Sequence, residues 1–270
     1  MARLTDCASA PGLVSILTFL VIGHYHVVKW SLGDFPMFAV LPSMDPRIAS
    51  IAPGFRALSI SVEAAEVVDT GVAAEALSRA CRALTTGDVA WSEPHLSAWA
   101  EVFRAFGAKP QRTPCSAAAL RKRVLRDGSL PSIDPIVDLY NAVSIEYAVP
   151  VGGENIVAYV GEPRLVIADG TESFDTMKNG VVVEESPKAG EIVWRDDIGV
   201  TCRRWNWRQG TRTRLSTDAD KMWFILESLP AMPLESLHDA GEQLVKGLRC
   251  MMPTAAIDSK LVDFKCQSSI

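Results

Sequence analysis

The clearest structural signal in the chain is the segment SIDPIVDLYNAVSIEYAVPVGGE, which spans residues 132–154. Asp134 followed by Pro135 is typical of a helix start, because a capping carboxylate accepts hydrogen bonds from free backbone N–H groups and proline fits the first turn. An apolar face then follows the predicted helix, with Ile133, Ile136, Val137, Tyr140 and Val143. After the helix, Gly152 and Gly153 predict a tight turn, which is either plain or one whose exposed N–H groups admit a ligand.

The segments on either side predict that helices and strands are segregated along the chain. Upstream, the spacing of apolar residues indicates a strand at 55–62 and helices at 92–106 and 113–126. Downstream, strands are expected at 156–160, 164–167, 180–183, 192–195, 200–206 and 222–229, and a final helix at 234–248. This segregation favours an α+β domain with a β-sandwich-like core and flanking helices over a doubly wound sheet.

The composition is that of an ordinary folded chain. Its 270 residues are 48% hydrophobic and 22% charged, and 27 basic against 32 acidic residues give a formal net charge of −5. This balance excludes a polybasic, histone-like binder and a disordered chain. The motifs GxGxxG, HExxH, GxSxG and the phosphate-binding P-loop do not occur, which counts against nucleotide-cofactor enzymes and serine hydrolases. Six scattered cysteines without a CxxC pair predict no disulfide scaffold, no metal site and no cofactor.

The first part of the chain differs in composition from the rest. We predict three regions. Residues 1–43 carry few charges and an apolar run too short to cross a bilayer, so we interpret them as a leader upstream of a natural start at Met44. A short membrane or packing appendage is the alternative. Residues 44–252 form the domain and 253–270 a C-terminal tail, neither with membrane contact, and cytoplasmic location follows by default.

Basic residues are concentrated in two stretches that contain no acidic residue. One lies between Val102 and Arg126, and the other runs from Arg203 to Arg214 with Trp205 and Trp207 interleaved. Guanidinium groups pair with phosphates and indole rings stack on bases, so this mixture favours single-stranded or looped RNA over duplex DNA. The predicted RNA-binding residues are Arg121, Lys122, Arg126, Arg208 and Arg212. The alternative is a solvated helix face in the first stretch and core tryptophans in the second.

Several segments of the chain resemble those of a known protein family. The segment 132–154 resembles the motif that opens the tRNA-editing module, the paired B-three/B-four domain, of the bacterial phenylalanyl-tRNA synthetase β subunit. The segments FRAFG (103–107), WRDD (194–197) and CRRWNWRQ (202–209) are similar to free-standing B-three/B-four proteins. The resemblance covers roughly residues 45–250. It implies a fold of that type, binding of tRNA or aminoacyl-tRNA rather than DNA, and hydrolysis of mischarged aminoacyl esters in trans, without aminoacylation.

The resemblance also implies a site, from which the chain departs at two positions. The synthetase motif has Thr where this chain has Tyr140, and a pocket His where it has Gly152. Hydrolysis would then rest on the amides of Gly152 and Gly153 as oxyanion donors and on Glu154 or Asp196 to orient water, with help from the terminal ribose hydroxyl. The expected substrate-binding residues are Tyr140, Asn141, Asp197, Arg204, Trp205 and Asn206. Because Tyr140 narrows the pocket, we expect an amino acid smaller than tyrosine.

Two other functions remain open from the sequence. The fold could persist as a non-catalytic RNA-binding or small-ligand-binding module that has lost the catalytic His. A small-molecule hydrolase unrelated to RNA is the third interpretation, and the missing nucleophile signature counts against it.

Overall fold

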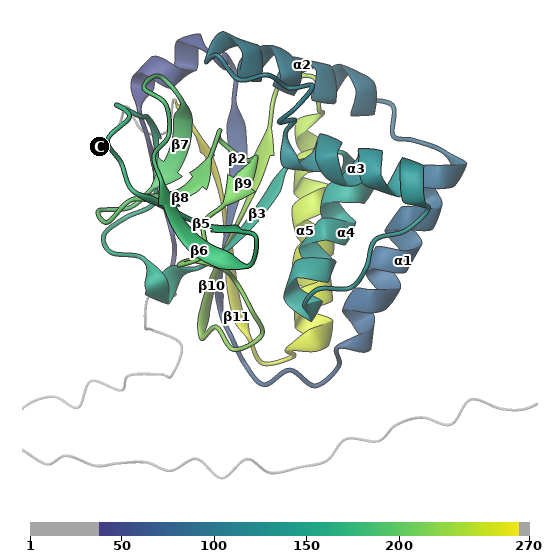
Figure 1. The fold of residues 1–270 in the computed structure, drawn as a ribbon. Helices are drawn as coiled ribbons and strands as arrows, with labels where there is room; N and C mark the ends of the chain where they lie inside the picture. The colour runs from purple at the N-terminus through teal and green to yellow at the C-terminus, as the bar shows by residue number, and fades with distance from the viewer. Residues whose placement is uncertain (1–37, 265–270) are drawn as a thin grey trace, which may run out of the picture. The chain divides into compact units, whose positions relative to one another are not determined.

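The computed structural model describes residues 38–264. Its centre is an antiparallel four-stranded sheet (Figure 1), with strands in the order β11 (Ala256–Asp263), β2 (Arg56–Glu63), β10 (Lys221–Ser228) and β3 (Val151–Asn155). In this register Phe224 of β10 pairs with Ile60 on one side and with Gly153 on the other. Side chains alternate between the two faces of a strand, so β2 and β10 contribute to a separate core on each face.

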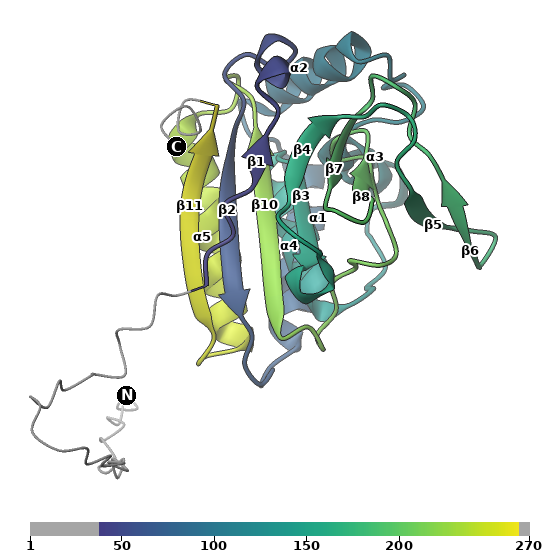
Figure 2. The same cartoon turned by 90° about the vertical axis from the view of Figure 1, so that its left-hand side faces the viewer.

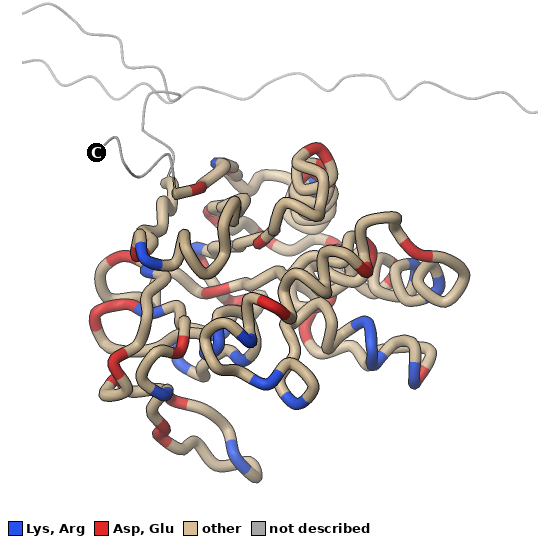
Figure 3. Tube along the Cα trace, turned by 90° about the horizontal axis from the view of Figure 1, so that it is seen from above, with Lys and Arg blue, Asp and Glu red and all other residues tan. Residues whose placement is uncertain are grey.

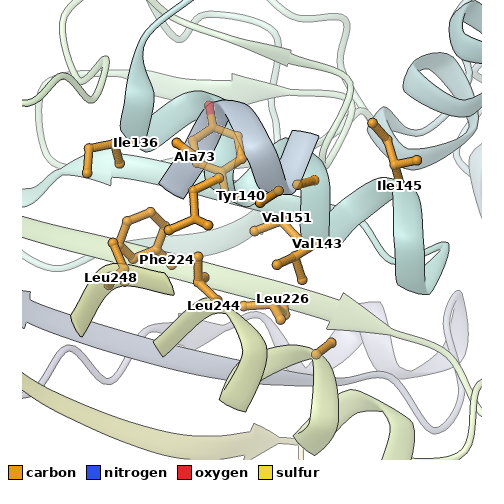
Figure 4. Close-up of a cluster of buried hydrophobic side chains, with 14 of the residues drawn as sticks. Ala73, Ile136, Tyr140, Val143, Ile145, Val151, Phe224, Leu226, Leu244 and Leu248 are labelled. Atoms are coloured by element: carbon orange, nitrogen blue, oxygen red, sulfur yellow. The ribbon is translucent and has the colours of Figure 1, made fainter. Parts of the chain in front are cut away.

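A layer of helices covers one face of this sheet. It consists of α1 (Gly71–Thr86), α3 (Ser116–Asp127), α4 (Pro135–Tyr147) and α5 (Leu234–Met251). Leu58 and Ile60 of β2 belong to the core on this side of the sheet. Phe224 of β10 lies in the same core close to Leu244 and Leu248 of α5 (Figure 4). The helical face of β10 is therefore formed by even-numbered residues.

A second sheet covers the other face. Its strands follow the order β1 (Ser43–Met44), β4 (Arg164–Ile167), β7 (Ile192–Arg195), β8 (Val200–Arg203) and β9 (Arg208–Gln209). Between the sheets lies an aromatic core in which Trp99 of α2 (Ser92–Ala105) and Trp205 are fully buried, with ring centroids 5.2 Å apart. The hairpin of β5 (Phe174–Lys178) and β6 (Val181–Glu185) extends beyond this sheet (Figure 2). Two short 3₁₀-helices, η1 (Pro46–Ser50) and η2 (Ile156–Ala158), complete the elements of this part. The α+β prediction with a sandwich-like core and flanking helices is confirmed.

The predicted start of α4 is correct in detail, whereas the turn predicted after it is not a turn. Asp134 Oδ1 accepts hydrogen bonds from the N–H groups of Ile136 and Val137, as an N-cap does. Gly152 and Gly153 lie within β3, paired with β10. The chain reverses earlier, at Ala148, which ends α4 with a left-handed φ of 51°.

Two predicted boundaries differ from the structure. Residues before Met44 already belong to the folded unit, because Val40 is buried and its N–H and C=O bond to the hydroxyls of Ser61 and Ser59. The rest of the expected leader, residues 1–37, lies outside the described residues. In the expected C-terminal tail, Ala256–Asp263 form β11, which is held by pairing with β2. Across residues 38–264, no helix is both long enough and apolar enough to cross a membrane.

Candidate active site

A cavity of about 260 Å³ lies where the two sheets and the helical layer meet. Its walls come from α3, α4, β3, β10 and the β8–β9 turn, and we call it the central cavity. Of the predicted site residues it brings together Tyr140, Asn141, Gly152, Gly153, Glu154, Asn206 and Arg208. Trp207, Gln209 and Glu227 also line it, together with Trp223 and Ile225 of β10.

The glycine pair lets the backbone of β3 form part of the cavity wall. A Cβ atom at position 153 would lie 2.8 Å from Cε1 of Tyr140, so only glycine fits without displacing that ring. The Gly153 carbonyl accepts a hydrogen bond of 2.7 Å from Gln209 Nε2 and therefore faces away from β10. Because the N–H and C=O of one strand residue point to the same side, the Gly153 N–H faces that way too.

Glu154 is the first of two buried carboxyl groups in this lining. It is 5% exposed, and its Oε2 atom has no hydrogen-bond partner among the described residues. Burial raises the pKa of this carboxyl to about 8, because an apolar surrounding disfavours the charged form. At neutral pH Glu154 is therefore mostly a neutral acid that can donate a proton.

Glu227 is the second carboxyl, and sequence reasoning missed it. Its Oε1 accepts from the indole N–H groups of Trp194 and Trp205 at 2.9 and 2.8 Å, and its Oε2 accepts from Asn206 Nδ2 at 2.8 Å. Burial raises the pKa of Glu227 to about 7, although the three hydrogen-bond donors favour the ionised form and act to lower it. The signal in the sequence was a lone charge in the apolar strand MWFILESL (222–229).

Asn206 connects Glu227 to the cavity space. With its amide nitrogen committed to Glu227, its Oδ1 is buried without a hydrogen-bond partner among the described residues. A buried acceptor without a donor costs about 1–3 kcal/mol, so a ligand that donates a hydrogen bond here would recover part of that cost. The cavity thus has unsatisfied oxygens at Asn206 and at Glu154.

An arginine and tryptophan cluster forms the rim of the cavity. The guanidinium carbons of Arg204 and Arg208 lie 4.3 and 5.4 Å from the ring centroid of Trp207. Arg204 and Trp205 both adopt left-handed φ angles, 48° and 64°, and the Trp205 N–H bonds to the Ile192 carbonyl. Such strain persists only where surrounding contacts hold it, so this turn fixes the direction of the neighbouring side chains.

Asp196 was predicted to orient water and Arg212 to bind RNA, but their side chains pair with each other outside the central cavity. Asp196 is fully buried and accepts hydrogen bonds from the N–H groups of Val160, Ile198 and Gly199. Arg212 adds two bonds of 2.9 Å. Burial acts to raise the pKa of Asp196, but the bonds from Arg212 and the backbone outweigh it and the pKa is lowered. Both residues hold the loop before β8 and lie outside the central cavity.

Three further predicted site residues, Trp205, Arg121 and Asp197, do not line the central cavity. Trp205 is fully buried in the aromatic core, and its indole N–H bonds to Glu227, so it orients that carboxyl from behind rather than touching a ligand. Arg121 is buried and donates to the Ile145 carbonyl and to Asp88. Asp197 is on the surface, paired with Arg164 at 2.7 Å, and does not line the cavity. Sequence cannot distinguish Trp205 and Arg121 from exposed residues, because charge and ring type do not report burial.

The remaining predicted residues lie at the surface or in a second cavity. Lys122 and Arg126 are exposed on α3, and Arg126 pairs with Asp127 at 2.7 Å. Arg204 faces a separate cavity, described below. Within residues 38–264, no group of three or more His, Cys, Asp and Glu side chains is arranged to hold a metal ion.

No histidine in the described part of the chain lines the central cavity. His95 is fully buried in the core, where its Nδ1 bonds to the Ala148 carbonyl and its Nε2 faces the N–H groups of Leu229 and Trp99. Burial lowers its pKa to about 4, so it stays neutral and structural. Cys202 does line the cavity, but burial raises the pKa of its thiol well above the usual value, which disfavours a nucleophilic thiolate.

Comparison with known proteins agrees with the resemblance found in the sequence. Residues 98–236, more than half of the chain, match the model of the B3/4 domain family. The chain belongs to the B3/4 domain family. Every residue that lines the central cavity lies within the matched part of this B3/4 domain. Membership supports tRNA or RNA binding as a property at the level of the family.

Among solved structures, the B3/4 domain is similar to an N-terminal fragment of the phenylalanyl-tRNA synthetase β subunit from Pyrococcus horikoshii. The two share 12% identity with a TM-score of 0.39, and the match covers 84% of this chain. It covers 57% of the fragment, so the chain spans little more than half of that relative. No curated protein sequence matches the chain.

Proposed function

We propose that this B3/4 domain binds the aminoacylated 3′ end of a tRNA and hydrolyses the ester of a wrongly attached amino acid. The observation that carries the proposal is the pair of buried carboxyls in one small cavity, Glu154 and Glu227, with pKa values raised to about 8 and about 7. Perturbed carboxyls in a cavity mark candidate sites of acid–base chemistry. The rim cluster of Arg204, Trp207 and Arg208 offers an RNA chain both charge and a stacking surface.

In the proposed complex the aminoacyl group enters the central cavity. Its α-ammonium group donates to Asn206 Oδ1, a buried acceptor without a partner among the described residues, and is attracted by the carboxyl of Glu227 behind it. A cation at this place favours the ionised form of Glu227. The ring of Tyr140 lies in the wall of this cavity and narrows it, so the proposed amino acid is smaller than tyrosine.

The proposed reaction is an ordinary ester hydrolysis. Water adds to the ester carbonyl carbon, the bond from that carbon to the ribose oxygen breaks, and the ribose oxygen takes up a proton. In this reaction the Gly153 N–H stabilises the oxyanion, and the protonated carboxyl of Glu154 supplies the proton to the leaving oxygen. A carboxyl with a pKa near the working pH can also take a proton back from the attacking water, which completes the cycle.

A panel of individually aminoacylated tRNAs, incubated with the full chain, tests this function. We expect one species to lose its ester selectively, and Glu154→Gln to slow that loss by ~10²–10⁴-fold without weakening tRNA binding, as for loss of a general acid. Asp197→Asn is the matched control, since it removes a surface carboxylate outside the cavity. Equal rates for wild type and Glu154→Gln would exclude the proposed role of Glu154.

The competing function is a non-catalytic RNA-binding module. It is supported by the lining of the cavity, which includes no histidine among the described residues. In that case every aminoacyl ester would survive as long as in buffer while tRNA binding at low salt persisted. If neither deacylation nor tRNA binding were found, both RNA functions would be wrong.

A further inference from the structure

A second cavity, of about 340 Å³, lies beside the rim cluster and is lined by four basic side chains. Lys109 and Arg112 come from the α2–α3 loop, Lys188 from the loop before β7, and Arg204 from the β8–β9 turn. We call it the basic cavity. Figure 3 shows Lys and Arg interspersed with Asp and Glu along the described chain, so this gathering of cations from three segments is a local feature.

The one acidic residue among the described residues that line the basic cavity is already neutralised. Glu191 accepts two hydrogen bonds from Arg203, at 2.9 and 3.0 Å, and a third from the Arg204 backbone N–H at 3.1 Å. Its pairing with the Arg204 side chain is longer, 3.7 Å. Glu191 therefore holds the turn in place and leaves little negative charge to offset the cations around it.

The other three cations have no such partner in the described part of the chain. Lys109, Arg112 and Lys188 form no ion pair with any carboxylate among the described residues, and all three are exposed at the cavity edge. Like charges that meet without a counter-charge repel, and an anion placed between them removes the repulsion and gains charge-assisted hydrogen bonds. This arrangement is suited to a phosphate group.

The basic cavity is joined to the central cavity through one cluster. Arg204 lines the basic cavity and at the same time stacks on Trp207, which lines the central cavity together with Arg208. A single RNA strand that ends in the central cavity would pass over Trp207 before it reached the basic cavity. The order along such a strand is ester, stacked base, phosphate.

We propose that the basic cavity binds one backbone phosphate of the single-stranded 3′ end of RNA, upstream of the nucleotide that carries the ester. The inference rests on the proposed function, in which that 3′ end enters the central cavity. Lys109, Arg112 and Lys188 hold the phosphate, and Trp207 stacks on an intervening base. One fixed phosphate would set how far the strand advances and so place the ester carbonyl beside Glu154.

Binding of the RNA tetranucleotide 5′-ACCA-3′, measured by fluorescence anisotropy, tests the phosphate site. We expect the double variant Lys109→Gln with Lys188→Gln to bind at least about tenfold more weakly, because it can no longer form charge-assisted hydrogen bonds with the phosphate. The slope of its salt dependence should fall by ~0.7 for each phosphate that the protein no longer neutralises. The double variant Lys246→Gln with Arg249→Gln removes the same charge from exposed positions of α5 and should bind like wild type.

Replacing each phosphodiester of the tetranucleotide in turn by an uncharged methylphosphonate locates the phosphate. Replacement of one linkage alone should weaken binding about tenfold in wild type and no further in the Lys109 and Lys188 variant, which is the signature of a direct interaction in a double-mutant cycle. Equal effects at all linkages, or effects that add fully in the variant, would overturn the assignment. So would saturable binding of inorganic phosphate without RNA binding, which would indicate a free-anion site.

The kinetics of deacylation separate this inference from the proposed function. If the lysine variant raises KM for aminoacyl-tRNA, both stand, whether or not kcat also falls because the ester is less well placed. If deacylation proceeds with KM unchanged, the phosphate site is wrong and the hydrolase stands. If wild type shows neither deacylation nor RNA binding, the proposed function fails and the phosphate site fails with it.

Discussion

Gly153 shows how one missing Cβ decides the shape of the central cavity. The Tyr140 ring packs against the bare backbone at this position, with Leu215 on the same side. The glycine pair was identified as important from the sequence but was predicted to form a turn. Glycine is required both where a ring packs directly against the backbone and where φ is positive, so its presence alone does not tell which of the two applies. Only the structure distinguishes the two.

Gly153→Ala should lower the free energy of unfolding by ~1–3 kcal/mol, the usual cost of an inserted methyl group in a packed core. The new Cβ would lie 2.8 Å from Tyr140 and 3.0 Å from Leu215. Urea denaturation measures the change. Gly152→Ala is the control, since its Cβ would lie 3.3 Å from a methyl group of Ile225, and should cost clearly less. Equal costs would show that the Tyr140 contact is not what limits the site.

Some of the residues predicted for the site line the central cavity, whereas burial places others elsewhere. Asn206 and Glu154 were predicted and lie in the central cavity. Arg121 was predicted to contact RNA, but its guanidinium is buried against the Ile145 carbonyl. Glu227 was overlooked because its three hydrogen-bond donors come from segments 21 to 33 residues away.

At the scale of elements, α5 is shaped by two glycines that bring it close to its neighbours. A Cβ at Gly241 would lie 2.1 Å from Cδ2 of Leu58 on β2, and one at Gly247 would lie 2.5 Å from Cδ1 of Leu139 on α4. Glycine is a poor helix former, by about 0.8–1.0 kcal/mol relative to alanine. Close packing against β2 and α4 offsets that cost.

Gly241→Ala should therefore destabilise the domain although it improves helix propensity. We expect the double variant Gly241→Ala with Leu58→Ala to be more stable than the sum of the single changes predicts, because the smaller side chain makes room for the new methyl group. Thermal and urea unfolding of the four proteins measure this coupling. Additive effects would mean that α5 shifts away from β2 instead of clashing with Leu58.

Elements with local signals were predicted well, and elements defined by distant pairing were not. The helix predicted at 92–106 is α2, Ser92–Ala105, because its apolar spacing lies within one segment. β3 and β11 were missed. β3 pairs with β10 some 70 residues later, and β11 pairs with β2 about 200 residues earlier. Nothing in a short window of sequence reports such a partner.

At the scale of the whole molecule, the buried carboxyls make stability depend on pH. The pKa of Glu154 is about 8 in the folded protein against an ordinary value of 4.5. Between these values the folded state keeps a proton that the unfolded chain has released. The contribution of Glu154 is therefore fully present below about pH 4.5 and is lost as pH rises toward 8.

We expect the free energy of unfolding of wild type to fall across this window and Glu154→Gln to reduce the fall, because glutamine carries no titrating proton. Denaturation at a series of pH values between 4.5 and 8.5 measures both slopes. Glu162→Gln, at an exposed position, is the control and should follow wild type. The same slope in Glu154→Gln and wild type would show that this carboxyl is ionised in the folded protein.

Alternate residues of strand β10 contribute to two different parts of the molecule. Its even positions, Met222, Phe224 and Leu226, belong to the helical core, while its odd positions, Trp223, Ile225 and Glu227, line the central cavity. Selection for a different ligand can therefore act on three alternate positions of one strand without disturbing the packing of the helices. A change at one of these positions would alter the cavity together with the core between the two sheets, where Trp223 and Ile225 also pack, and would leave the helical core in place.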